Sequence, residues 1–502
     1  MPEGQHQHIL FLTGELAEPR LRRVLAGLEP LDFRTTVVSL GVKVAALATT
    51  EIVLRRLGST EGADLVLLPG RFRGDLDRLS AHFGVPFERG PDELDDLPQH
   101  FRRQTAPVDL GRYHTRIFAE IVEAPLLDVP AILERAARFA ADGADVIDLG
   151  CLPDHPFPHL EDAVRAVRDA GHTVSVDSLE PRDLLRGASA GASYLLSLTE
   201  ATAWVARETD AVPVVIPTTP ADLPSLYRAV DAIRGEGRRC IADPILEPIH
   251  YGFTDSLLRY REVRARHPDL EILMGIGNVT ELTDADTSGM NALLMGIVSE
   301  LRIDHVLAVQ VSPHCRRAIR EFDAARRQFF AAKEAGALPR GFGEGLLCLR
   351  DRKPFTSTPA EVADLAARIR DPNYRIEVTD QGIHLYNRDG HHVAGDPFAL
   401  YPHIDARGDP GHAFYLGAEL ARAQIAWQLG KRYSQDNELR WGVAVDAVGD
   451  DPTGFHAVGT TRASKPGPAK PEDGTPGLSS ARRSSPAAMR TGTSMWRRWA
   501  PR

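Results

Sequence analysis

The sequence predicts an α/β protein whose centre is a closed (β/α)8 (TIM) barrel, flanked by an N-terminal α/β layer domain and a small C-terminal α+β domain. Short apolar runs rich in Val, Ile and Leu recur eight times between residues 116 and 320, and helical patterns separate them. The chain has 502 residues, which is enough for about three domains. A doubly wound open sheet is the alternative architecture for the same alternation of strands and helices.

Residues 1–100 are predicted to form a small Rossmann-like α/β layer domain. Strand patterns at 8–13, 35–40 and 64–69 alternate with helical patterns at 20–28 and 44–57. The residues after the first strand do not form the G-x-G-x-x-G motif of dinucleotide sites, so a packing or partner-binding role is the simpler interpretation.

Residues 112–336 are predicted to form the barrel. Its eight strands are expected at 116–122, 145–149, 173–176, 194–197, 213–217, 240–242, 272–276 and 306–311. Helical patterns fall between them, among others at 129–141, 160–170, 223–235, 255–266 and 290–301.

Residues 340–449 are predicted to form the C-terminal α+β domain, with a hairpin at 374–378 and 383–386 and an Ala-rich helix at 412–432. Pro, Gly, Ser and Arg dominate residues 450–502 without periodicity, which predicts a disordered tail.

Composition excludes several classes of protein. The net charge is −10, from 59 basic and 69 acidic residues, which argues against a nucleic-acid-binding protein. No apolar run approaches the roughly 20 residues of a membrane span. The four cysteines form no C-x-x-C pair, so we expect a cytoplasmic protein. No lysine lies between positions 44 and 332, which excludes Schiff-base chemistry in the barrel.

Polar residues end most of the predicted barrel strands, where the loops of a TIM barrel build the active site. They are Glu120, Asp148, Asp177, Ser197, Asp243, Asn278 and His314. Four carboxylates are therefore expected at one mouth, where they must accept hydrogen bonds, bind a cation or stay protonated. The alternative is that each acidic residue only caps the helix that follows it.

Three segments resemble the pterin-binding barrel family, which contains the dihydropteroate synthases and the methyltetrahydrofolate:corrinoid methyltransferases. They are 147–150 (IDLG), 174–178 (VSVDS) followed by Gly191-Ala192, and 242–248 (ADPILEP). Within this family the chain is most similar to dihydropteroate-synthase-related proteins of tetrahydromethanopterin-type cofactor pathways. The resemblance covers about residues 8–445.

The resemblance implies a set of pterin contacts. It places Asp177 and Asp243 on the pterin ring, with Asp148 beside them. Ser197 and Glu120 stand where family members commonly carry asparagines, and the place of Glu120 implies Mg²⁺ held at this residue.

The resemblance also implies catalytic groups. Asn278, in 275–279 (GIGNV), resembles the methyltransferase asparagine that approaches a pterin nitrogen. His314 and Arg316 resemble the anion-binding pair of the synthases, in reversed order. The loop 151–155 lacks the arginine that the synthases carry there, and their lysine after strand 7 is also absent.

The expected function is therefore that of a dihydropteroate-synthase-like transferase in folate- or tetrahydromethanopterin-type cofactor biosynthesis. It would join a pterin-methyl group to an arylamine co-substrate, and by analogy with the family it would form a homodimer. Two alternatives stay open: a methyl-tetrahydropterin:corrinoid methyltransferase, and a non-catalytic subunit that carries a pterin.

Overall fold

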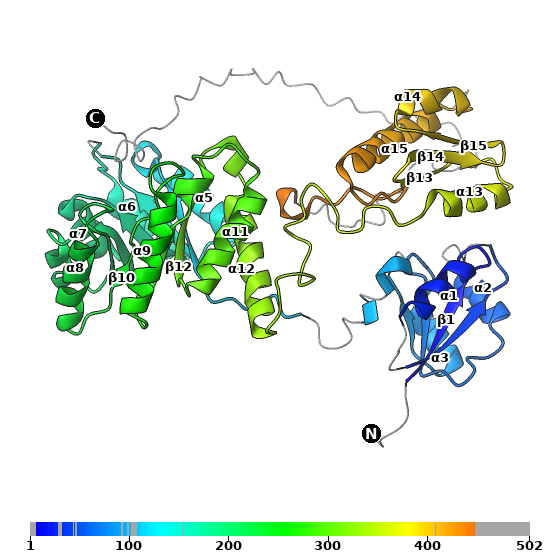
Figure 1. Ribbon diagram of the computed structural model, residues 1–502, viewed down its shortest axis with the longest axis horizontal. Coiled ribbons are helices and arrows are strands. Elements are labelled where there is room, and N and C mark those ends of the chain that lie inside the picture. Colours follow the sequence, from blue (N-terminus) through cyan, green and yellow to red (C-terminus); the bar gives the residue numbers. More distant parts are fainter. Residues whose placement is uncertain are drawn as a thin grey trace, which may run out of the picture. The chain divides into compact units, whose positions relative to one another are not determined.

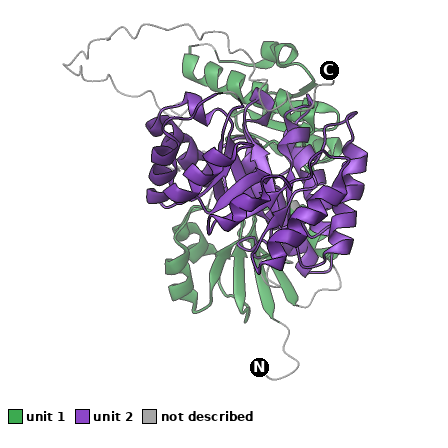
Figure 2. Cartoon of the chain, turned by 90° about the vertical axis from the view of Figure 1, so that its left-hand side faces the viewer, with its two compact units in different colours: residues 1–108, 349–440, 452–463 green, residues 109–348, 441–451, 464–502 purple. Residues whose placement is uncertain are grey.

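The computed structural model describes residues 7–28, 33–43, 45, 48–91, 94–97, 100–101, 108–153, 155–406 and 408–446. The predicted disordered tail, 450–502, lies outside the described residues. The described chain divides into two compact units, one of residues 7–108 and 349–440 and the other of residues 109–348 and 441–446 (Figure 2).

Eight parallel strands of the second unit close into a barrel in the order β10-β11-β12-β5-β6-β7-β8-β9. The strands are β5 (Arg116–Ile121), β6 (Val146–Gly150), β7 (Thr173–Asp177), β8 (Tyr194–Leu198), β9 (Val212–Val215), β10 (Ile241–Ala242), β11 (Glu271–Gly275) and β12 (His305–Val309). The pairing of β12 with β5 closes the ring. The (β/α)8 prediction is confirmed, and the open-sheet alternative is wrong.

Helices surround these strands (Figure 1). They are α5 (Val129–Ala141), α6 (Leu160–Asp169), α7 (Pro181–Ala190), α8 (Leu223–Gly235), α9 (Phe253–Arg266), α11 (Thr287–Glu300) and α12 (Ala318–Glu334). The side chain of Asp128 caps α5 and that of Asp222 caps α8, each followed within two residues by a proline. These signals explain why the bounds of both helices match the sequence prediction.

Alternation along the strands decides which side chains point into the barrel. Phe118, Val146 and Ile241 belong to a cluster that fills its interior, whereas neighbours such as Ile117 and Ile147 pack in the larger core with the helices. Each of those three interior residues is followed two positions later by an acidic residue, namely Glu120, Asp148 and Asp243. These carboxylates therefore follow the interior face at the carboxyl ends of the strands.

Arg326 of α12 holds the barrel closed near the start of β5. Its side chain is 1% exposed and donates to the carbonyl oxygens of Thr115 and Gly143, each at 2.8 Å, and to Asp145 Oδ2 at 2.5 Å. Its guanidinium also stacks on the ring of Tyr113, 3.6 Å from the centroid. One cation thus ties the last helix to the segments before β5 and β6.

The N-terminal part of the first unit is a parallel sheet in the order β2-β1-β3-β4. Its strands are β1 (His8–Thr13), β2 (Arg34–Ser39), β3 (Leu65–Leu68) and β4 (Phe87–Arg89), and its helices are α1 (Glu18–Ala26), α2 (Thr50–Arg56) and α3 (Leu76–Phe83). Two apolar clusters use alternate residues of β1 and β3, so both faces of the sheet are covered.

The C-terminal part is an antiparallel sheet, β13 (Arg375–Thr379), β14 (Gly382–Asn387) and β15 (Gly390–Ala394). The helix α15 (Pro410–Leu429) contributes to the same apolar cluster as Ile383 and Leu385 of β14. Tyr386 of β14 packs in a separate cluster with residues of α13 (Pro359–Arg368). The predicted hairpin and helix are present, and β15 is a third strand that the sequence pattern missed.

Candidate functional site

Three carboxylates from neighbouring strands meet at the carboxyl end of the barrel. Glu120 of β5, Asp148 of β6 and Asp177 of β7 each offer one oxygen, and these oxygens lie within 4.8 Å of one another. In the strand ladder Glu120 pairs with Asp148 and Gly150 pairs with Asp177. Three of the four carboxylates that were expected at one mouth lie together here, and a divalent cation is one group that such a set of oxygens could hold.

Asp148 is the most buried member of this cluster, with 0% of the residue exposed. Ser175 Oγ donates to Asp148 Oδ1 at 2.5 Å, while Asp148 Oδ2 has no hydrogen-bond partner in the described part of the chain. Burial, and next to it the negative charge of Asp177, raises the pKa of Asp148 well above its usual value. A proton or a cation is therefore needed to keep this carboxyl group inside the barrel.

Asp243, directly after β10, is oriented by two donors on one oxygen. Tyr260 Oη of α9 donates to Asp243 Oδ1 at 2.7 Å and the backbone N–H of Ile245 donates to the same atom at 2.8 Å. Asp243 Oδ2 accepts no hydrogen bond from the described residues. Burial raises the pKa of Asp243 to about 6, against the two hydrogen bonds, and the charge of Asp177 adds to the increase. Asp243 thus presents one oriented acceptor oxygen, and the pKa of its carboxyl group, about 6, lies near neutral pH.

The loop that carries Asp243 is held by Arg259 of α9. The Arg259 guanidinium donates to the carbonyl oxygens of Pro244 and Ile245 and forms an ion pair of 2.8 Å with Glu247, in which each side chain is 13% exposed. Ile245 has φ +67°, a strained conformation for a β-branched residue. The contacts of Arg259 hold the backbone in this conformation, which turns the Ile245 N–H toward Asp243.

Ser197 lies in an irregular part of β8. Its φ is +74°, and the pairing of β8 with β9 shifts register between Leu195 and Leu198. Such bulges redirect side chains and are frequent beside active sites. Ser197 is half-buried in this bulge.

Asn278, His314 and Arg316 form no hydrogen bond or ion pair with the four carboxylates among the described residues. Asn278 Nδ2 donates to the carbonyl oxygen of Leu246 at 2.7 Å, so it ties the end of β11 to the loop that carries Asp243. His314 Nε2 lies 3.1 Å from the carbonyl oxygen of Thr280. Arg316 is exposed, and no described residue forms an ion pair or hydrogen bond with its side chain. Of these three, Arg316 remains available for an anion.

Glu281, in the acidic stretch after β11, supports the backbone that follows β12. Its two carboxylate oxygens accept the N–H groups of Val311 and Ser312, each at 2.8 Å. These contacts fix the segment from which His314 and Arg316 extend.

Sequence reasoning missed Ser175, Tyr260, Arg259 and Gly150. A Cβ atom at Gly150 would lie 2.5 Å from Glu120 Oε1, so a larger residue here would displace this carboxylate from its present position. Tyr260 is fully buried, and a buried tyrosine needs a hydrogen-bond partner for its hydroxyl group. A tyrosine within the predicted helix 255–266 was therefore the one signal in the sequence for such a partner.

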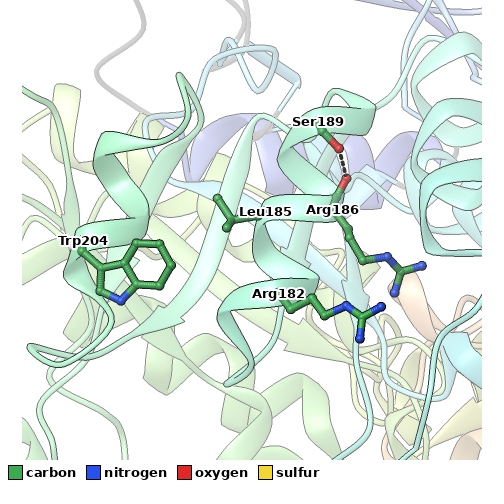
Figure 3. Close-up of a pocket in the computed structure, with 5 residues that line it drawn as sticks. All are labelled: Arg182, Leu185, Arg186, Ser189 and Trp204. Carbon is green, nitrogen blue, oxygen red and sulfur yellow. Dashed lines mark hydrogen bonds between the residues drawn. The ribbon is translucent and has the colours of Figure 1, made fainter.

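A surface cavity of about 490 Å³ lies elsewhere, along α7 and the 3₁₀ turn η4 (Ala203–Arg207) (Figure 3). Leu185 and the half-exposed Trp204 line it together with Arg182, Arg186 and Ser189. The guanidinium of Arg186 is engaged by Glu161 and Asp183. None of the strand-end residues lines this cavity, so we place the candidate site at the carboxylates.

Comparisons with known proteins match different parts of the chain. Residues 7–92 match the model of a family of unknown function, DUF6513. An uncharacterized protein of Methanocaldococcus jannaschii is 26% identical over 523 aligned positions, which cover 86% of this chain and 98% of that protein.

Among solved structures, a dihydropteroate synthase of Yersinia pestis in a sulfonamide complex is 16% identical, with a TM-score of 0.37, over 45% of this chain and 96% of that chain. The synthase of Coxiella burnetii in complex with pteroic acid is 16% identical, with a TM-score of 0.36, over 44% and 94%. That of Thermus thermophilus is 20% identical, with a TM-score of 0.35, over 44% and 95%. The assignment of the barrel rests on the strand order of this chain.

No helix in the described part of the chain is both long enough and apolar enough to span a membrane.

Proposed function

We propose that the mouth of the barrel binds a pterin ring and that the protein transfers the pterin-methyl group to an arylamine, in the biosynthesis of a folate- or tetrahydromethanopterin-type cofactor. The observation that carries this proposal is the orientation of Asp243. Its Oδ1 is held by Tyr260 and by the Ile245 N–H, while Oδ2 has no partner among the residues described. The free oxygen of a carboxylate oriented in this way can accept an N–H group of an amidine edge such as that of a pterin.

The other groups take roles around this anchor. Asp177 and Ser197 would contact the ring, and Asp148 would lie beside them. The arylamine nitrogen would attack the methylene carbon of a 6-hydroxymethylpterin pyrophosphate while the bond from carbon to the pyrophosphate oxygen breaks. The pyrophosphate would leave with the electron pair, and the amine would release a proton to solvent. Arg316 is the exposed cation that would meet the leaving anion together with His314, and Asn278 would approach a pterin nitrogen. Mg²⁺ at Glu120 would supply charge neutralisation for the pyrophosphate.

Calorimetric titration of the full chain with 6-hydroxymethyl-7,8-dihydropterin pyrophosphate tests the proposal. Asp243→Asn is the informative variant because the amide oxygen can keep both hydrogen bonds from Tyr260 and Ile245. The amide NH2 group would then face the N–H donors of the ligand. A charged hydrogen bond lost in this way is worth up to about 3 kcal/mol, so we expect binding to weaken about 100-fold.

Asp255→Asn is the matched control. It makes the same chemical change at an exposed position of the same helix that carries Tyr260, and it should leave binding unchanged. If the wild-type chain does not bind this ligand, or if Asp243→Asn binds it as tightly as wild type, the proposed site is wrong.

Turnover separates the proposed transfer from the alternatives. Release of pyrophosphate on addition of 4-aminobenzoate, as a test arylamine, would support the transferase. Methyl transfer from a methyl-tetrahydropterin to free cobalamin, followed by its visible spectrum, would instead support a methyltransferase. Pterin binding with neither reaction would indicate the non-catalytic carrier.

A further inference from the structure

The cluster of Glu120, Asp148 and Asp177 needs a source of positive charge. Glu120 is 5% exposed and Asp148 0%, and Asp148 Oδ2 and Asp177 Oδ1 are buried oxygens without hydrogen-bond partners in the described chain. No described arginine, lysine or histidine forms an ion pair with Asp148 or Asp177. Three ionised carboxylates this close would repel one another strongly in a buried site, so protons or a bound cation must neutralise them.

The distances within the cluster suit a small hard cation. Two oxygens on opposite sides of such an ion lie apart by twice the metal–oxygen distance, which is about 4.0–5.2 Å for bonds of about 2.0–2.6 Å. Oxygens on adjacent sides lie closer together. The ligand oxygens of the three residues all lie within 4.8 Å of one another, and Mg²⁺, with bonds of about 2.0–2.1 Å, would draw opposite oxygens together to about 4.2 Å.

The residues around the cluster also resemble those that support the ligands of a metal site in other proteins. Ser175 Oγ holds Asp148 Oδ1 at 2.5 Å, as outer hydrogen-bonding partners hold metal ligands in place. Gly150 leaves the space that the Glu120 carboxylate occupies, because a Cβ atom there would lie 2.5 Å from Glu120 Oε1. The buried, unpartnered oxygen of Asp148 and this clearance at Gly150 are observations separate from the acidic composition of the cluster.

We infer that Glu120, Asp148 and Asp177 together form a binding site for one hard divalent cation of the Mg²⁺ or Mn²⁺ type. This inference goes beyond Mg²⁺ at Glu120 alone and does not require that the substrate is a pterin. Three protein ligands leave about three of the six positions of an octahedral ion for water or for phosphate oxygens of a substrate. Asp177 then joins the cation site to the mouth, where its negative charge also acts on Asp243.

The test is Mn²⁺ binding to the full chain after treatment with a chelator and exchange into chelator-free buffer. The electron paramagnetic resonance signal of free Mn²⁺ reports binding, and Mg²⁺ is added as a competitor. We expect one Mn²⁺ per chain, displaced by Mg²⁺. Asp148→Asn should weaken binding about 100-fold, and Gly150→Ala, which displaces Glu120 without altering a ligand, about 10-fold. Glu200→Gln removes an exposed carboxylate from the loop after β8 and should bind like wild type.

The circular dichroism of each variant shows whether it has folded. The inference is overturned if the folded wild-type chain binds no Mn²⁺ at millimolar concentration, or if folded Asp148→Asn keeps full affinity. Calorimetry with the pterin ligand in excess chelator separates this result from the proposed function. Pterin binding without any Mn²⁺ binding would refute only the cation inference. Mn²⁺ binding without pterin binding would refute only the proposed function.

Discussion

Removing the side chain of Arg326 should destabilise the barrel far more than removing that of its neighbour Arg327. Arg326 is 1% exposed and donates hydrogen bonds to Asp145 and to the carbonyl oxygens of Thr115 and Gly143. In Arg326→Ala each of these acceptors loses its hydrogen bond from the guanidinium, at the point where the last helix meets the first strand.

The magnitude follows from what is left behind. Breaking a buried ion pair by removing one partner costs about 3–5 kcal/mol. Asp145 keeps two donors, the hydroxyl of Tyr113 at 2.7 Å and the N–H of Ile117 at 2.8 Å, which places its share at the lower end. The two carbonyl oxygens add about 1 kcal/mol each when they lose their donors. We expect a loss of about 5 kcal/mol, which lowers the melting temperature of a unit of this size by roughly 15 °C.

Scanning calorimetry on the full chain measures this shift. Arg327→Ala is the control because its partly exposed side chain pairs with Asp323 at 2.8 Å and stacks on the same Tyr113 ring. An exposed pair contributes less than about 1 kcal/mol, so its melting temperature should fall by only about 2 °C. Equal shifts for the two variants, or an Arg326→Ala protein that melts like wild type, would refute the reasoning.

Two further predictions concern pH. Pterin binding should strengthen as pH rises through about 6, where Asp243 ionises, and Tyr260→Phe should move this midpoint to higher pH because the Tyr260 hydrogen bond lowers the pKa of Asp243. Calorimetric titrations between pH 5 and 8 would show an unchanged midpoint if Tyr260 has no such effect. Burial lowers the pKa of His384 to about 4, and the nearby His391 contributes. The unfolded chain binds the extra proton below about pH 6.5, so stability of the C-terminal domain should fall by about 3 kcal/mol as pH drops from 6.5 to 4. His384→Gln cannot titrate, and thermal melts of this variant should show a smaller decline over that range than melts of the wild type.

The barrel could be predicted from the sequence because its strands carry their own signals. Each is a short apolar run with helices on either side, and polar residues mark where the strand ends. Alternation then places Glu120, Asp148 and Asp243 on the inner face. Strand position alone thus accounts for three of the four carboxylates at this end of the barrel.

The partners of these residues could not be predicted in the same way. Tyr260 meets Asp243 from a helix 17 positions later, and the pairing depends on how α9 packs against the barrel. Asn278 carries a family-like motif, yet its amide group is bonded to the backbone of Leu246. The strand β15 has the sequence GHHVA, which lacks the apolar alternation of an ordinary strand.

The three carboxylates of the cluster lie on the consecutive strands β5, β6 and β7, whose separation is set by backbone hydrogen bonds. Adjacent strands lie about 4.8 Å apart whatever sequence their connections have. Insertions or substitutions in the loops that cover the barrel can therefore alter which second substrate binds, while the spacing of the three carboxylates stays the same. The reaction of such a chain can therefore change through its loops while the cluster of three carboxylates stays in place.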